Sequence, residues 1–111
     1  MAIDIIIRGV PGATVVDFHG RLDLHSRWHV KAVMNQCCAT ETERLMLNLQ
    51  GLTFVDSAGL GFLVMSSRKF QDLNRKITWI YGPGFVGDLI LQLQIQELIP
   101  MATSIQDAFS S

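Results

Sequence analysis

Hydrophobic and polar residues follow a pattern along this chain that predicts five short strands. Two β-rich runs open the sequence, and Pro11 and Gly12 between them are typical of the tight turn of a hairpin. The next run, RLMLNL, is mostly apolar, which is typical of a strand buried in the middle of a sheet. The predicted strands cover residues 3–10, 13–20, 44–49, 76–82 and 98–101.

Between the later strands, apolar residues recur at spacings of mostly three and four, which indicates amphipathic helices. Asp23 or Ser26 is placed to cap the first helix, and Asn74 is a suitable stop for the second. Ser104 is placed to cap the last helix, with Asp107 as its partner in a capping box. The predicted helices cover residues 26–40, 58–74, 86–94 and a short segment after Ser104.

The resulting order, ββαβαβαβα, predicts an α/β fold in one domain, residues 1–111. The opening hairpin is antiparallel, and the alternation after it indicates parallel strands joined by right-handed helical crossovers. We therefore expect a mixed sheet of four to five strands with about four helices. In such sheets the loops that follow the strands gather at one end, so residues 20–26 and 54–61 should lie close together.

Composition narrows the class of protein. Of the 111 residues, 49% are hydrophobic and 17% charged, and nine lysines and arginines face ten aspartates and glutamates. The formal net charge of −1 leaves no basic stripe for a phosphate backbone, so we expect no nucleic-acid binding. Every apolar run is far shorter than the ~20 residues of a transmembrane helix. The N-terminal segment is too short and too interrupted by charge for a signal peptide, so we expect a cytoplasmic protein.

The cysteines and histidines give only weak indications of a reactive or metal site. Cys37 and Cys38 are adjacent near the end of a predicted helix, where geometry disfavours a disulfide between them. We interpret them as small, reduced packing residues, with redox sensing as the alternative. His25 and His29 are four residues apart with Asp23 nearby, a spacing compatible with a metal, but no H-E-x-x-H motif and no fourth ligand accompany them. We expect no metal and no cofactor.

The run FVDSAGLG, residues 54–61, contains the strongest candidate for chemistry, Ser57. Val55 stands where the G-x-S-x-G nucleophile elbow has glycine, and nothing fixes a histidine nearby as a base, so we expect no serine hydrolase. Gly59 and Gly61 lack the third glycine of G-x-G-x-x-G and the lysine of a Walker loop, and we attribute them to close packing or to the approach of another backbone. Asp56 or Ser57 can cap the following helix. We expect no catalytic residue and no enzymatic activity.

Phosphorylation is a further role that suits Ser57, because the residue begins a predicted helix on an exposed loop. A phosphate adds about −1.5 to −2 charges and three acceptor oxygens, which the helix dipole and its free N–H groups can hold without unfolding the domain. With Asp56 beside it, the new charge would repel a partner whose surface fits a small neutral serine. The modification would change the surface and leave the fold intact.

Residues 49–61, LQGLTFVDSAGLG, resemble the signature of STAS domains, specifically of the single-domain anti-sigma factor antagonists. Residues 20–23, GRLD, resemble the second motif of the family, G-x-[LIV]-D, and the two motifs stand in the family's order and spacing. The resemblance implies the STAS fold and a bacterial partner switch. In that switch an ATP-dependent anti-sigma factor, a serine kinase with a histidine-kinase-like fold, phosphorylates the serine that corresponds to Ser57. A metal-dependent serine phosphatase reverses the step.

In the family, the unmodified antagonist binds the kinase and frees its sigma factor or other client, and the phosphorylated form dissociates. The resemblance implies that Asp23, Asp56, Ser57 and Gly59 form the partner-binding site. The alternative is a STAS domain that does not switch, such as a stressosome-type scaffold or an accessory subunit of a transporter. A serine at position 57 favours the switch, because a scaffold needs no phosphorylatable group there.

The sequence also departs from the family pattern. Ala58 stands where many members have a second serine, which removes an ambiguity about Ser57 as the acceptor. Arg21 stands where many members have an acid, and Asn74 and Arg75 stand where glycines are common. These differences bear on the identity of the partner more than on the class of protein. In the last third of the chain the resemblance rests on the apolar rhythm alone.

Overall fold

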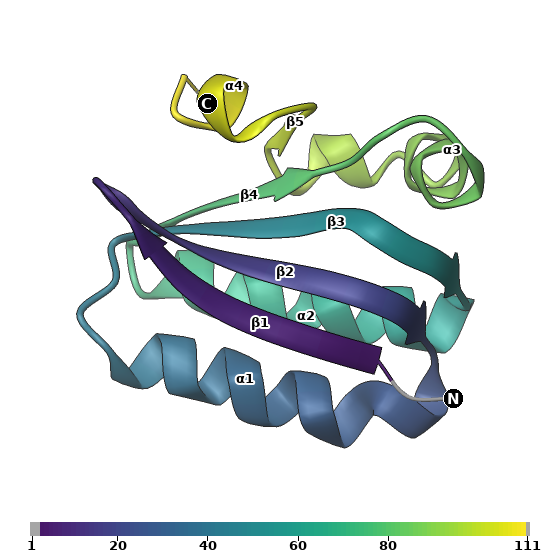
Figure 1. Ribbon diagram of the computed structural model, residues 1–111, viewed down its shortest axis with the longest axis horizontal. Coiled ribbons are helices and arrows are strands. Elements are labelled where there is room, and N and C mark those ends of the chain that lie inside the picture. Colours follow the sequence, from purple (N-terminus) through teal and green to yellow (C-terminus); the bar gives the residue numbers. More distant parts are fainter. Residues whose placement is uncertain (1–2, 111) are drawn as a thin grey trace.

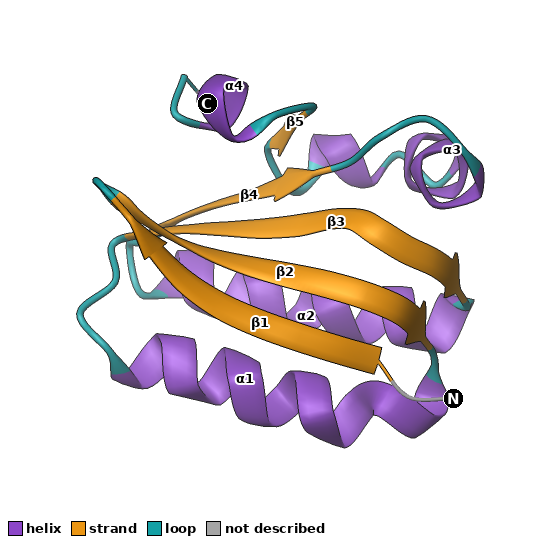
Figure 2. Ribbon diagram, in the orientation of Figure 1, coloured by secondary structure: helices purple, strands orange, loops and turns teal. Residues whose placement is uncertain are grey.

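A computed structural model describes residues 3–110 of the protein as a five-stranded mixed sheet with helices packed against it (Figures 1 and 2). The strands lie in the order β1-β2-β3-β4-β5. They are β1 (Ile3–Val10), β2 (Ala13–Leu22), β3 (Arg44–Val55), β4 (Lys76–Ile80) and β5 (Met101–Ala102). The helices are α1 (Arg27–Ala39), α2 (Ser57–Asp72), α3 (Phe85–Gln92) and α4 (Ile105–Ala108), with short 3-10 turns η1 (Leu24–Ser26) and η2 (Ile95–Glu97).

The direction of the strands brings the loops that follow β2 and β3 to one end of the sheet. β1 and β2 form an antiparallel hairpin, and its turn contains Gly12 at a φ of +84°, which favours glycine. β2, β3, β4 and β5 are parallel to one another. The carboxyl ends of β2, β3 and β4 therefore lie at the same end of the sheet, where they lead into η1, α2 and α3.

Alternate side chains of the central strand β3 enter two different apolar clusters. Leu45, Leu47 and Leu49 belong to the larger cluster, which also includes buried side chains of α1 and α2. Met46 belongs to a smaller cluster that includes Ala108 of α4. Figure 1 shows α1 and α2 on one side of the sheet and α4 on the other. The sheet is therefore buried on both faces along its centre, as the apolar character of β3 predicts.

The predicted α/β class, the opening hairpin, the five strands and the expectation of about four helices are confirmed, but four strand boundaries differ. β2 continues to Leu22, beyond the predicted end at residue 20, and β4 ends at Ile80, before the predicted end at residue 82. β3 was expected to end at Leu49 but continues to Val55, and it stays paired with β2 to the end through two register shifts, at each of which β3 has one extra residue. The last strand was predicted over residues 98–101, but β5 covers only Met101–Ala102. The N–H groups of Leu98 and Ile99 donate to the carbonyl of Ile95, at 2.8 and 3.0 Å, and belong to the turn after η2.

The helix ends follow the predicted punctuation with one exception. Asn74 lies just after α2 with a φ of +61°, in the left-handed region, and confirms the predicted stop. Ser104 caps α4 by accepting the N–H of Asp107 at 3.0 Å. The predicted capping box is nevertheless wrong, because the Asp107 carboxylate accepts from Thr103 Oγ1 at 3.3 Å and not from the N–H of Ser104.

Candidate functional site

Two loops meet where β2 and β3 end, and they carry the residues singled out in the sequence. The N–H of Asp56 donates to the carbonyl oxygen of Leu22 at 3.2 Å. Gly59 is buried against the same carbonyl, and an added Cβ would lie 2.6 Å from that oxygen and 3.1 Å from the nitrogen of Asp23. The predicted convergence of the loops and the close packing of Gly59 are confirmed. Close packing is wrong for Gly61, where an added Cβ would meet no atom within 4 Å.

Ser57 is the first residue of α2, and it is exposed. The structure selects Asp56 as the cap of this helix: its carboxylate accepts the N–H of Gly59 at 2.7 Å and its carbonyl accepts the N–H of Leu60 at 2.9 Å. Within residues 3–110, Ser57 Oγ makes no hydrogen bond, and the N–H groups of Ser57 and Ala58 have no partner either. A free hydroxyl thus stands beside two free backbone donors at a helix N-terminus.

Asp23 caps η1 in a reciprocal capping box with Ser26. Its Oδ1 accepts the N–H groups of His25 and Ser26 at 3.0 and 3.2 Å, and Ser26 Oγ accepts the N–H of Asp23 at 2.8 Å. Loss of solvent around the carboxyl acts to raise the pKa of Asp23, but these hydrogen bonds outweigh it and hold the pKa below its ordinary value. Its Oδ2 lies 3.9 Å from Arg21 Nε. Asp23 is therefore an ionised, fixed carboxylate at the rim of the site.

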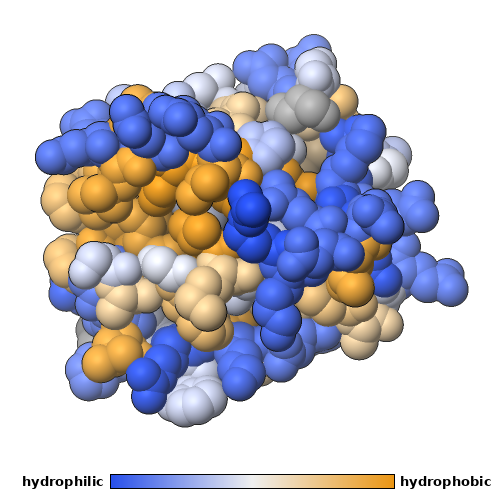
Figure 3. Space-filling view, turned by 180° about the vertical axis from the view of Figure 1, so that it is seen from behind, coloured by the Kyte–Doolittle hydropathy of each residue, from blue (hydrophilic) through white to orange (hydrophobic). Residues whose placement is uncertain are grey.

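An open groove of about 470 Å³ runs beside Ser57, between η1 and α2. Its apolar walls include Leu24, which is 49% exposed, and Met65, which is 67% exposed. The groove is lined by Leu24, Arg27, Ser57, Ala58, Gly61, Phe62 and Met65. Figure 3 shows the molecule from behind, with hydrophobic side chains gathered on part of that face and bordered by polar ones. Exposed apolar surface of this kind is typical of a protein-binding site.

This groove continues between α1 and α2 into a second hollow of about 370 Å³, which shares Phe62 and Met65 with the first. Lys31 and Lys69 lie along it. The two helices together carry four lysines and arginines and one acid, Asp72. Sequence reasoning missed the groove, because the spacing of the apolar residues predicts the helices but not which surface lies exposed between them. The signal was the position of Phe62 and Met65 off the helix stripe that is buried in the structure.

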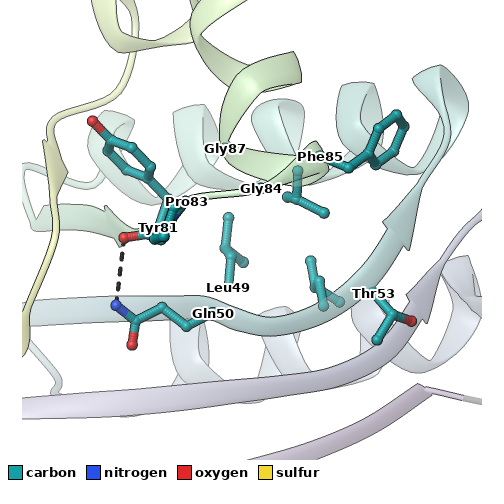
Figure 4. Close-up of a pocket in the computed structure, with 11 residues that line it drawn as sticks. Leu49, Gln50, Thr53, Tyr81, Pro83, Gly84, Phe85 and Gly87 are labelled. Carbon is teal, nitrogen blue, oxygen red and sulfur yellow. Dashed lines mark hydrogen bonds between the residues drawn. The ribbon is translucent and has the colours of Figure 1, made fainter.

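An aromatic stack on the other side of the site was also missed. The guanidinium of Arg21 lies 4.1 Å from the ring centre of Phe54, and the rings of Phe54 and Phe85 stack with centres 6.1 Å apart and an interplanar angle of 10°. Figure 4 shows Phe85 at one end of a pocket of about 170 Å³, where Gln50 donates to the carbonyl of Tyr81 at 3.4 Å. None of the residues lining this pocket is charged, so it offers no acid–base pair.

Cys37 and Cys38 are both free thiols, and Cys37 is buried. Burial, reinforced by the neighbouring Cys38, raises the pKa of the Cys37 thiol to about 11, so it is a protonated packing residue at neutral pH. In the part of the chain that the structure describes, no three His, Cys, Asp or Glu side chains are grouped as metal ligands. Across residues 3–110, no helix has both the length and the apolar character needed to span a bilayer.

Comparisons with known proteins agree with this architecture. A family model of the STAS domain matches residues 4–108. An anti-sigma factor antagonist from Mycobacterium paratuberculosis has a similar structure, with a TM-score of 0.88 and 18% identity over 97% of this chain and 92% of that one. The anti-sigma factor antagonist SpoIIAA in its unphosphorylated form has a TM-score of 0.70 and 17% identity, over 94% of this chain and 92% of that one. Bacillus SpoIIAA in its phosphorylated form has a TM-score of 0.70 and 16% identity, over 96% of this chain and 97% of that one. No curated protein matches the sequence.

Proposed function

The chain belongs to the STAS domain family, and we propose that it is a single-domain anti-sigma factor antagonist of a bacterial partner-switching pathway, controlled by phosphorylation of Ser57. The observation that carries the proposal is the state of the Ser57 hydroxyl, which is exposed, lies at the start of a helix and takes part in no hydrogen bond within residues 3–110. The hydroxyl is therefore available to a kinase, and its modification breaks no contact of the described fold.

The unmodified protein binds its partner, a serine-kinase anti-sigma factor, through the groove beside Ser57. Leu24, Phe62 and Met65 supply apolar surface whose removal from water favours association. Asp23 supplies an ionised carboxylate at the rim of the site. Gly59 is buried beneath the site, so it contributes by holding the two loops together.

Phosphorylation of Ser57 weakens the binding of the protein to the kinase. The kinase transfers the γ-phosphoryl group of ATP to Ser57 Oγ. The bond from the γ-phosphorus to its bridging oxygen breaks, an O–P bond to serine forms, the hydroxyl proton passes to a base of the kinase and ADP leaves. The product carries about −1.5 to −2 charges, which the free N–H groups of Ser57 and Ala58 and the helix dipole stabilise. A partner seated on the groove would have to strip water from this phosphate, close to the carboxylate of Asp56, and binding weakens.

The chemistry belongs to the partners in this proposal. The kinase adds the phosphate, and a metal-dependent serine phosphatase removes it. The chain catalyses no reaction and needs no cofactor. It acts in the cytoplasm, where the anti-sigma factor and its client are found, and the unmodified form releases that client by occupying the kinase.

The test is to incubate the protein with Mg-ATP and a serine-kinase anti-sigma factor from the same organism and to measure the intact mass. We expect one added phosphate on the wild type and on Ser66→Ala, a matched serine on the same helix, and none on Ser57→Ala. Calorimetric titration of the kinase should show binding weaker by roughly tenfold or more after phosphorylation, about 1.4 kcal/mol per factor of ten. Phosphate retained in Ser57→Ala refutes the assignment. Equal binding by both forms supports a STAS module that does not switch.

A further inference from the structure

The outer edge of the sheet is long and unprotected. β1 is the first strand in the sheet order, and one side of it pairs with β2 without interruption from Ile3 opposite Gly20 to Val10 opposite Ala13. Its other side faces no strand among residues 3–110. The opposite edge, β5, is only two residues long. An edge of eight residues without a bulge presents a row of unpaired backbone N–H and C=O groups that can pair with another strand.

The side chains of this edge are apolar at the centre and charged on either side. Ile6 is 53% exposed and Ile7 is 37% exposed, whereas Ile5 is half-buried. Asp4 and Arg8 flank these three isoleucines. Exposed isoleucines are costly to leave in water, and residues 4–8 form the sequence D-I-I-I-R, in which the two charges have opposite signs and lie at equal distances from Ile6.

We propose that two copies of this chain associate through antiparallel pairing of β1 with β1, with Ile6 on the two-fold axis. In this register Ile6 faces Ile6 of the second copy, Ile5 faces Ile7, and Asp4 faces Arg8. Each exposed isoleucine is covered, and both charge pairs are attractive. The pairing is isologous, as a two-fold dimer requires, and it joins the two sheets into one.

Other pairings of the same strands are less favourable. A parallel pairing in register would place Asp4 beside Asp4 and Arg8 beside Arg8, which repel. An antiparallel pairing shifted so that Ile7 faces Ile7 would place Arg8 opposite Ile6. The charge pattern therefore selects the register centred on Ile6.

Arg8 keeps donors available for this contact. Its Nε donates to Asp17 Oδ2 at 2.6 Å and its Nη2 to Asp17 Oδ1 at 3.4 Å, and its side chain is 43% exposed. Its Nη1 makes no hydrogen bond within residues 3–110 and is free for the Asp4 carboxylate of the second copy. Because Asp17 fixes the guanidinium, little side-chain freedom is lost when the second carboxylate binds. The interface is a single strand pair, so the dimer is weak and depends on concentration.

The dimer leaves the Ser57 site accessible. Ile3 pairs with Gly20, so the amino end of β1 lies at the same end of the sheet as the Ser57 site. Antiparallel pairing then places the two Ser57 sites at opposite ends of the joined sheet. The inference is independent of the proposed function, since it needs neither a kinase nor a phosphate.

Sedimentation equilibrium of the full chain over about 10 µM to 1 mM, a range that spans weak association, tests the proposal. The weight-average mass of the wild type should rise toward twice the monomer mass. Ile6→Lys and Asp4→Arg, which place like charges against each other, should remain monomeric. Leu73→Lys and Asp72→Arg make the same kinds of change at exposed positions of or next to α2 and should behave as the wild type. A monomeric wild type at every concentration, or a dimer that survives Ile6→Lys, overturns the proposal.

A disulfide test fixes the register. In a Cys38→Ser background, Ile6→Cys places two thiols on the axis, where facing strands bring them close enough to bond, and mild oxidation should give a covalent dimer. Asp4→Cys in the same background places the thiols four residues apart along the strands, roughly 13 Å, which is too far for a disulfide. Equal cross-linking of the two variants would refute this register.

Discussion

The two glycines at the start of α2 should respond in opposite ways to the same substitution. In Gly59→Ala the new Cβ would lie 2.6 Å from the carbonyl oxygen of Leu22 and 2.9 Å from its carbonyl carbon. Both are backbone atoms, so no side chain can rotate away. To reach an ordinary contact of 3.4 Å, the two loops must separate by about 0.8 Å (3.4 minus 2.6 Å).

This separation of the two loops makes Gly59→Ala destabilising. It would stretch the hydrogen bond from Asp56 N–H to Leu22 from 3.2 to about 4.0 Å, beyond hydrogen-bonding range. Loss of this bond costs about 0.5–1.5 kcal/mol and overpacking about 1–3 kcal/mol. The better helix propensity of alanine offsets at most about 1 kcal/mol. We expect a net loss of about 1–3 kcal/mol in the free energy of unfolding and a fall of about 4–12 °C in Tm.

Gly61→Ala is the matched control, two residues further along the same helix. No atom lies within 4 Å of the added Cβ, so only the gain in helix propensity remains. We expect this variant to be more stable than the wild type by about 0.5–1 kcal/mol. Urea unfolding followed by far-UV circular dichroism, with calorimetric Tm values, measures both changes. A Gly59→Ala protein as stable as the wild type, or a common sign for the two variants, would refute the reasoning.

Three further predictions concern buried polar groups. Ser67→Ala removes the acceptor of the buried Trp79 indole N–H, which donates at 2.9 Å, and should lower the free energy of unfolding measured in urea by about 1–3 kcal/mol. Burial acts to raise the pKa of Asp17, but hydrogen bonds from its arginine and asparagine neighbours lower it below 3.8, so its contribution to stability is lost as pH falls through the folded pKa. Asp17→Asn should therefore destabilise the protein at about pH 7, and the difference from the wild type in urea should shrink as the pH falls below 3.8 and through the lowered pKa of Asp17. A thiol reagent followed by absorbance should modify Cys38 in the native protein and Cys37, with its pKa of about 11, only after unfolding.

The order of elements could be predicted from sequence because each signal was local. Period-two and period-three-to-four patterns, a Pro-Gly turn and the stop at Asn74 all act within a few residues. The end of β3 could not be predicted, because Gln50 and Gly51 resemble a strand end. Gly51 instead packs against the backbone of Phe18, where an added Cβ would lie 2.6 Å from the carbonyl oxygen, and no side chain fits. That requirement depends on how β2 lies beside β3, which no local pattern reveals.

The candidate site also has parts that the local sequence predicts and parts that only the tertiary structure reveals. The place of Ser57 at a helix start could be predicted, because the acid, the serine and the helix start are consecutive, but the choice of Asp56 over Ser57 as the cap came from the structure. The stack of Arg21, Phe54 and Phe85 joins three segments that meet only when β2, β3 and α3 are in place. The groove needs the exposure of Leu24 as well as a position on α2, so its existence follows from tertiary packing. What sequence reasoning missed is therefore the surface around the serine.

In the two loops, Asp23, Asp56 and Gly59 hold the fold together, whereas the side chain of Ser57 does not. The Asp56 carboxylate is engaged by the N–H of Gly59, and Asp23 by the N–H groups of its own turn. Gly59 is fixed by its contact with Leu22. Ser57 alone among these residues has a polar side chain that no contact within residues 3–110 uses. A charge added there breaks none of the described hydrogen bonds, so the property it changes is the surface offered to a partner, and stability and binding should respond independently to substitution at this position.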